Sequence, residues 1–194
     1  MAGRPKHYQE EELITKATNI FWKKGYTAAS AQDLMEAMDI GQGSLYRTFK
    51  GGKRELYQKS LIQFLDEAIK QFFKNLEASE NPLQFIKDFF YAIPMNSTEK
   101  KQKGCYLGNA IVELSNIDEE TKLIATEQLN RLKEGFEKAL FMAQEKNLLD
   151  KDKSPELIAL HLINLWNGIN VTYRMNPDND DITELLKLNL KILD

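Results

Sequence analysis

Apolar residues recur along this 194-residue chain at the three- and four-residue spacing of an amphipathic helix, and no stretch keeps the alternation of a β-strand. Candidate capping residues divide this pattern into separate segments. They predict helices over about residues 10–24, 30–38, 43–49, 53–78, 82–94, 104–115, 118–147, 155–175 and 181–193. The polar stretch NSTEKKQKG, after the fifth of these helices, is expected to be a mobile loop. We therefore predict an all-α fold of about nine helices.

The composition, 42% hydrophobic and 28% charged, is typical of a globular protein and excludes several other classes. No apolar run approaches the roughly 18 residues of a membrane-spanning helix, and the first residues lack an apolar signal core. A single cysteine excludes an internal disulfide, so we expect a protein of the reducing cytoplasm. We find no nucleophile–base pair, phosphate-binding loop or metal cluster. The sequence therefore predicts neither an enzyme nor a bound cofactor.

The charge is unevenly distributed, although the net charge is only -3. Residues 1–55 contain nine Lys or Arg against seven Asp or Glu, whereas residues 56–194 contain seventeen against twenty-two. The N-terminal part is thus mildly basic and the remainder is acidic. This polarity favours an N-terminal part that faces phosphates, but it is too modest to establish nucleic-acid binding alone.

The stretch SAQDLMEAMDIGQGSLYRTF, residues 30–49, predicts two short helices joined by a tight turn. Ser30 is a typical N-cap, and Asp33 stands in the first helical turn, where a negative charge complements the helix dipole. Residues 39–42 form the predicted turn. Such a pair of helices is the form in which many proteins place a second, recognition helix in the major groove of DNA.

The second helix of this pair offers polar and small side chains that suit a DNA groove. Gly43 and Ser44 would let the backbone approach the groove floor. Gln42 can pair with an adenine edge, and Arg47 can contact guanine or hold a phosphate. The hydroxyl of Tyr46 suits a phosphate oxygen. The plain alternative is that the aromatic residues here belong to the core and that the arginine is a solvated surface charge.

The segment GYTAASAQDLMEAMDIGQGSLYRTF resembles the N-terminal signature of the TetR/AcrR family of bacterial transcriptional regulators. The matching positions are Gly25, Tyr26, Thr27, Gly43, Ser44, Leu45, Tyr46, Phe49 and Lys53. The resemblance implies a helix-turn-helix DNA-binding domain over residues 1–52. It also implies a helical body over residues 53–194, which binds a small-molecule effector and dimerises through its last two helices.

Further DNA contacts are expected around this motif. Thr27 and Ser30 can donate to a backbone phosphate, and Lys53 begins the next helix, where its charge and free N–H groups favour an anion. Arg4 and Lys6, in the N-terminal tail, could enter a narrow minor groove. The alternative for these two residues is a disordered tail with no DNA contact.

The penultimate predicted helix is apolar on more than one face, so it should be buried on both sides. Its apolar residues are Leu157, Leu160, Ile163, Leu165, Trp166 and Ile169. A second copy of the chain is the partner that the resemblance implies, and ordinary intramolecular packing is the alternative.

Effector pockets are lined mainly by apolar and aromatic side chains with a few polar groups. Residues of these kinds in the body are Phe72, Phe89, Phe90, Cys105, Tyr106, Asn109, Phe136, Met142, His161, Trp166, Asn170 and Tyr173. For each of them taken singly, core packing is the alternative. We expect a mostly apolar effector.

Cys105 has two possible roles. It stands close in sequence to Lys100, Lys101 and Lys103, which would lower the pKa of its thiol and make it reactive. It could equally be a small buried apolar residue. The leading hypothesis is a homodimeric repressor, released from an inverted-repeat DNA operator by a small molecule. The alternative is a regulator that oxidants or electrophiles switch through Cys105.

Overall fold

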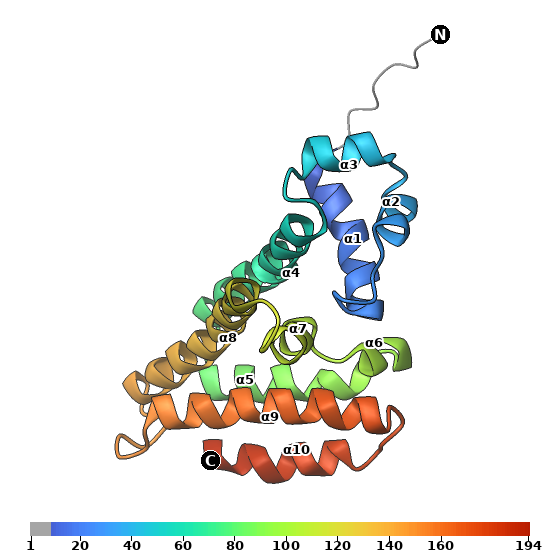
Figure 1. The fold of residues 1–194 in the computed structure, drawn as a ribbon. Helices are drawn as coiled ribbons and strands as arrows, with labels where there is room; N and C mark the ends of the chain where they lie inside the picture. Colours follow the sequence, from blue (N-terminus) through green and yellow to red (C-terminus); the bar gives the residue numbers. More distant parts are fainter. Residues whose placement is uncertain (1–8) are drawn as a thin grey trace.

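The computed structural model describes residues 9–194, and within them it contains ten α-helices and two short 3-10 helices (Figure 1). The α-helices are α1 (Glu10–Lys24), α2 (Ala31–Met38), α3 (Gln42–Thr48), α4 (Gly52–Glu77), α5 (Pro82–Tyr91), α6 (Thr98–Lys103), α7 (Tyr106–Leu114), α8 (Glu119–Glu145), α9 (Pro155–Met175) and α10 (Ile182–Leu190). The 3-10 helices are η1 (Ile93–Met95) and η2 (Lys191–Leu193). None of the helices in residues 9–194 is long and apolar enough to cross a membrane.

One prediction about the secondary structure was wrong. The stretch expected to be a mobile loop contains the helix α6, which the hydroxyl of Ser97 caps by accepting from the backbone N–H of Lys100. The helix ends at Gly104, whose φ of 66° lies in the left-handed region. Apolar periodicity could not reveal α6 because the helix has no buried residue. It packs instead on α9, where the ammonium of Lys101 lies 4.9 Å from the ring centroid of Tyr173.

The three N-terminal helices pack around their own apolar stripes and form a head that stands apart from the body (Figure 1). Phe21 of α1, Leu34 of α2 and Phe49 at the end of α3 are all fully buried. The ring of Tyr57 in α4 packs against Phe21 with ring centroids 4.7 Å apart. Because α4 begins inside the head and continues into the body, it joins the two. The predicted division between residues 52 and 53 stays a prediction.

The body is built around the long helices α4 and α8, which pack against each other, and around α9, which packs on α8. Figure 1 shows α9 lying below α5, with α10 as the outermost element at the C-terminal end. An aromatic cluster fills the space between α4, α5 and α8. In it, the rings of Phe72 and Phe136 lie 5.9 Å apart and those of Phe89 and Phe136 lie 5.3 Å apart. This cluster forms one wall of the cavity described below.

Candidate functional site

The first helix of the helix-turn-helix, α2, is delimited by local polar contacts and by a left-handed residue at its end. The hydroxyl of Ser30 accepts from the N–H of Asp33 (3.1 Å), and the carboxylate of Asp33 accepts from the N–H of Ser30 (2.9 Å), which is a capping box. The ammonium of Lys24 donates to the same carboxylate at 2.6 Å and, as the largest cause, lowers the pKa of Asp33 to about 2. Asp39 ends α2 in the left-handed conformation, with φ 56°. These contacts set the start and the end of α2.

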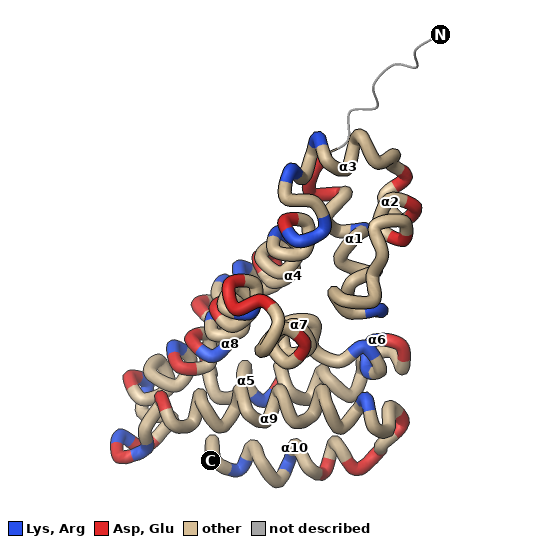
Figure 2. The backbone as a smooth tube through the Cα atoms, in the orientation of Figure 1, with Lys and Arg blue, Asp and Glu red and all other residues tan. Residues whose placement is uncertain are grey.

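The helix α3 presents the predicted polar face to solvent. Gln42, Gly43 and Arg47 are exposed, and Tyr46 keeps half of its surface accessible. An added Cβ at Gly43 would meet no atom within 4 Å, so the backbone is open to a close approach. Leu45 packs inward. Figure 2 shows Lys and Arg gathered where α3 passes into α4, while acidic residues mark α2. The exposed face of α3 can therefore enter a DNA groove.

The other predicted DNA contacts have different surroundings. Thr27 and Ser30 are exposed, but the hydroxyl of Ser30 donates to Asp33 at 2.8 Å and so is already engaged. The ammonium of Lys53 lies 4.6 Å from the ring centroid of Tyr26, and burial lowers its pKa. The helix α4 begins at Gly52, one residue earlier than expected. The ammonium of Lys53 donates to the carbonyl of Thr27 at 3.4 Å, so this side chain contacts the loop between α1 and α2. Arg4 and Lys6 lie outside the described residues.

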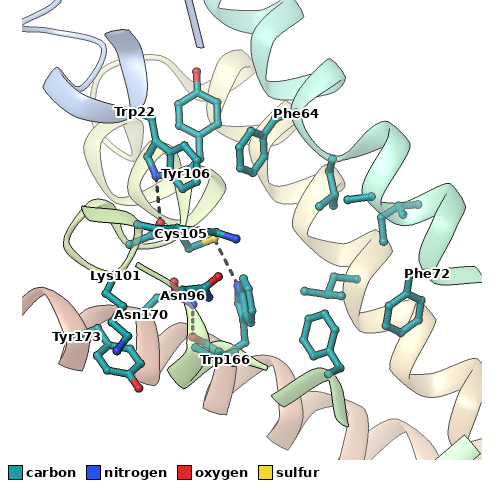
Figure 3. Close-up of a pocket in the computed structure, with 18 residues that line it drawn as sticks. Trp22, Phe64, Phe72, Asn96, Lys101, Cys105, Tyr106, Trp166, Asn170 and Tyr173 are labelled. Atoms are coloured by element: carbon teal, nitrogen blue, oxygen red, sulfur yellow. Dashed lines mark hydrogen bonds between the residues drawn. The ribbon is translucent and has the colours of Figure 1, made fainter. Parts of the chain in front are cut away.

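A cavity of about 300 Å³ lies within the body and reaches the head at Trp22 (Figure 3). It is lined by Trp22, Phe64, Leu65, Ala68, Ile69, Phe72, Phe89, Ile93, Asn96, Lys100, Lys101, Gly104, Cys105, Tyr106, Leu132, Trp166, Asn170 and Tyr173. Seven of the twelve residues predicted to form a pocket are brought together here, namely Phe72, Phe89, Cys105, Tyr106, Trp166, Asn170 and Tyr173.

The other five predicted pocket residues lie elsewhere. Phe90 and Phe136 are fully buried in the aromatic core. The amide of Asn109 donates to the carbonyl of Lys103 and accepts from an arginine of α9. Met142 lies near the C-terminal end of α8. The Nε2 atom of His161 is buried and has no hydrogen-bond partner in residues 9–194. Periodicity assigns each of these side chains to a helix face but does not say which neighbour covers that face.

Trp22 is the cavity residue that the sequence interpretation missed and that matters most, because it belongs to α1 of the head. Its indole N–H donates to the carbonyl of Gly104 at 3.0 Å, and its ring packs edge-on against Phe64 at 5.0 Å. One signal was available in the sequence. Trp22 is a large aromatic residue directly after Phe21, off the stripe that the head buries within itself. Such a side chain needs a partner from another element.

The thiol of Cys105 is part of the cavity wall and is nearly inaccessible. Its Sγ atom accepts from the N–H of Gly108 (3.3 Å) and from the indole N–H of Trp166 (3.4 Å). Burial raises the pKa of the thiol above its ordinary value. A raised pKa leaves little reactive thiolate at neutral pH. Of the two roles considered for Cys105, these surroundings favour a small buried residue over a reactive thiol.

Polar contacts tie the body to the head on the side of α7. The two carboxylate oxygens of Glu113 accept from the backbone N–H groups of Tyr26 (2.9 Å) and Thr27 (2.7 Å). At the N-terminus of α8, both oxygens of Asp118 accept from the guanidinium of Arg54, at 2.6 and 2.9 Å. Cys105, which lines the cavity, caps the N-terminus of α7, and Glu113 lies near the C-terminal end of the same helix. A shift of α7 would therefore move both residues.

Comparison with known proteins places the two halves of this architecture in one family. Residues 13–59 match the family model of the bacterial regulatory proteins of the tetR family. Residues 83–188, more than half of the chain, match the model of the tetracyclin repressor-like C-terminal domain. The chain belongs to the TetR family. It is a helix-turn-helix transcriptional regulator and not an enzyme.

Individual members of the TetR family are similar to the chain along most of its length. The transcriptional repressor DhaR of Mycobacterium sp. strain GP1 is 25% identical over 184 residues, which cover 94% of this chain and 91% of DhaR. The uncharacterized regulator YezE of Bacillus subtilis strain 168 is 25% identical over 194 residues, covering 99% of this chain and all of YezE.

Solved TetR-family structures have the same fold. The reduced form of NemR from E. coli superposes with a TM-score of 0.81 at 18% identity, covering 96% of each chain. The regulator CifR, solved as a cysteine mutant with a 26-base-pair operator DNA, superposes with a TM-score of 0.77 at 18% identity, covering 97% of this chain and 98% of CifR.

Proposed function

We propose that this TetR-family regulator is a homodimeric repressor that a small molecule, bound in the cavity, releases from an inverted-repeat operator. The observation that carries the proposal is the position of Trp22. It is a residue of the DNA-binding head, yet its side chain forms part of the cavity wall. A molecule that enters the cavity therefore touches the head directly. Its binding can favour one orientation of the head over another, which is the condition for a population shift.

A second connection runs through α7. The helix starts at Cys105 and Tyr106, which line the cavity, and Glu113 near its other end holds the loop between α1 and α2. The hydroxyl of Tyr106 also pairs with that of Ser60 in α4 at 2.6 Å. An occupant that displaces the start of α7 would thus move both the α1–α2 loop and α4. Allosteric coupling of this kind amounts typically to about 1–3 kcal/mol.

The exposed apolar side chains of α9 and α10 support a dimer. Several large apolar residues on the two helices are exposed, namely Leu157, Leu160, Val171, Met175, Leu185 and Leu188. On α9 they recur at helical spacing around Gly168, where an added Cβ would meet no atom within 4 Å. A helix of a second copy could therefore approach closely. Two heads related by a two-fold axis would present their α3 helices about 34–36 Å apart, which requires an inverted repeat.

The names of the relatives favour repression over activation as the effect on transcription. DhaR and ComR, the latter from E. coli and 31% identical over 115 residues, are both transcriptional repressors. The structure of CifR contains operator DNA. We propose repression for this chain because these relatives are named as repressors and the chain has the DNA-binding domain of the same family.

The test is binding of the purified protein to the DNA immediately upstream of its own gene. We expect footprint protection of an inverted repeat. Arg47→Ala should weaken binding by about 1–3 kcal/mol, because Arg47 is exposed on α3 and is proposed to contact a base or a phosphate. Lys16→Ala is the matched control, since it removes one exposed positive charge of the head from α1 instead. Equal losses in the two variants would contradict a specific role of α3.

The response to an effector also distinguishes release by a reversible small molecule from a redox switch at Cys105. Cys105→Ser should leave a reversible small molecule able to release DNA, because the thiol is held as a buried hydrogen-bond acceptor. Loss of every response in this variant, with DNA binding intact, would favour an oxidant- or electrophile-driven switch.

A further inference from the structure

The cavity is polar at one end and apolar at the other. Figure 3 shows Asn96, Lys101, Asn170 and Tyr173 on one side, and Phe72 on the opposite side. The remaining apolar lining includes Leu65, Ile69, Phe89 and Leu132. An occupant that fills this space must therefore join an apolar body to one polar end.

The polar end is positively charged. Lys100 and Lys101 of α6 line the cavity, and no Asp or Glu is among the lining residues. Neither lysine forms an ion pair within residues 9–194. The ammonium of Lys101 lies 4.9 Å from the ring centroid of Tyr173, so an aromatic face holds it at the cavity. Two lysines without a paired carboxylate in residues 9–194 thus line one end of a cavity whose remaining lining is mainly apolar.

The third lysine of α6 has a different position. Lys103 does not line the cavity, and its ammonium pairs with Glu99 at 2.8 Å. The same short helix therefore carries two lysines that line the cavity and one, Lys103, that pairs with Glu99 and does not line it. The ammonium of Lys103 lies 5.6 Å from the ring centroid of Trp22, so Lys103→Gln can change the tryptophan fluorescence itself and serves as the charge control through the ratio of the probe affinities.

We propose that the effector is a hydrophobic monocarboxylate, whose carboxylate lies at Lys100 and Lys101 and whose apolar body fills the cavity toward Phe72. This proposal rests on the proposed function, which places the effector in this cavity. Charge-assisted hydrogen bonds to a carboxylate are stronger than neutral ones, especially beside an apolar wall that excludes water. The side-chain amides of Asn96 and Asn170 stand at the same end and can supply further hydrogen bonds.

Tryptophan fluorescence can report on binding in the cavity. It contains two tryptophans, Trp22 and Trp166, and both line the cavity. Tryptophan fluorescence therefore reports directly on an occupant. Three probes with the same apolar chain but different end groups are titrated into the full-length protein: octanoate, octanol and octylamine. We expect octanoate to bind about tenfold more tightly than octanol, and octylamine to bind most weakly.

The variant Lys100→Gln/Lys101→Gln should lose this preference, so that octanoate and octanol bind equally. Its unchanged affinity for octanol would show that the cavity is intact. The variant Lys103→Gln should keep the full preference. Equal binding of octanoate and octanol to the unaltered protein would overturn the proposal, as would a preference that survives the double substitution.

The same probes are then added to the complex with operator DNA. Release by octanoate and octanol alike would uphold the proposed function and overturn the monocarboxylate. Lysine-dependent octanoate binding without any change in DNA affinity would uphold the ligand class and contradict the proposed release mechanism.

Discussion

At the scale of single residues, α4 and α7 are joined by a buried contact between two hydroxyl groups that differ in their number of hydrogen-bond partners. The hydroxyl of Ser60 donates to the carbonyl of Tyr57 and also meets the hydroxyl of Tyr106, each at 2.6 Å. Without Tyr106, the hydroxyl of Ser60 would keep the carbonyl of Tyr57 as a partner. Without Ser60, the hydroxyl of Tyr106 would have no hydrogen-bond partner in the described part of the chain. An unsatisfied buried hydroxyl costs more than the loss of a typical net hydrogen bond.

We therefore predict that Ser60→Ala destabilises the protein more than Tyr106→Phe does. Tyr106→Phe should lower the free energy of unfolding by about 1 kcal/mol, and Ser60→Ala by about 1–3 kcal/mol. Urea unfolding of both variants provides the comparison. A larger loss for Tyr106→Phe would contradict this description of the contact.

The ion pair of Arg54 with Asp118 makes stability depend on pH. The guanidinium of Arg54 lowers the pKa of Asp118 well below its ordinary value of 3.8. An acid with a lowered pKa in the folded state contributes stability above its ordinary pKa and loses this contribution as the pH falls further. Because Arg54 is well exposed, the contribution at pH 7 should stay below about 1 kcal/mol.

Asp118→Asn keeps an oxygen to cap α8 but removes the charge. The difference in unfolding free energy between this variant and the unaltered protein should therefore shrink as the pH is lowered from about 7 to about 2. Urea titrations across this range measure it. Glu119→Gln, in the same turn but paired only at the surface with Lys122, serves as the control. A difference that is constant with pH would show that the charge of Asp118 is not the cause.

At the scale of elements, α7 is the helix that links the cavity to the head. Its Glu113 carboxylate satisfies two backbone N–H groups of the α1–α2 loop, while its N-terminal residues line the cavity. Gly25, at the start of that loop, has a φ of 81°, and a Cβ there would lie 3.0 Å from the Glu113 carboxylate. The loop is therefore shaped to receive this side chain.

We predict that Glu113→Gln weakens the coupling between effector and DNA. A glutamine has one side-chain oxygen, so its NH₂ group would face one of the two backbone N–H groups. The ratio of operator affinities without and with an effector should fall toward one, and stability should fall by about 1–2 kcal/mol. Glu120→Gln, whose carboxylate contacts Arg54 instead, should retain the ratio. An unchanged ratio in Glu113→Gln would place the coupling elsewhere, most directly in Trp22.

At the scale of the whole molecule, α9 and α10 expose several large apolar side chains, at the end of the body opposite the head (Figure 1). An inverted repeat is read by two α3 helices at a fixed distance, and only a dimer sets that distance. The same interface would therefore decide both the stability of the assembly and the spacing of the two heads.

Leu160→Glu should convert the protein to a monomer and abolish tight operator binding, because it would place a charge in the proposed interface on an exposed apolar position of α9. Sedimentation and operator titration measure the two effects. Leu123→Glu alters an equally exposed leucine near the N-terminal end of α8 and should leave both unchanged. Monomers that bind the full operator as tightly as the unaltered protein would contradict the proposed interface.

The sequence by itself determined most of the local structure of this protein, with α6 as the exception. Caps such as Ser30, Asn81 and Ser154 each bond the first turn of the helix that they begin, as their residue types predict. The stripe of α1 and the spacing around α3 sufficed for the helix-turn-helix and for its resemblance to the TetR family. Such signals span only a few residues and depend on backbone geometry that is the same in every helix.

Tertiary structure alone decided the cavity. The contact between Trp22 and Gly104 joins residues 82 positions apart, and no local pattern encodes it. Phe72 and Phe136 were both expected to line the effector pocket, but the packing of α4, α5 and α8 leaves Phe72 at the cavity and buries Phe136. A helix face is set by its own 3.6-residue repeat, whereas its neighbour depends on how distant segments share one limited core.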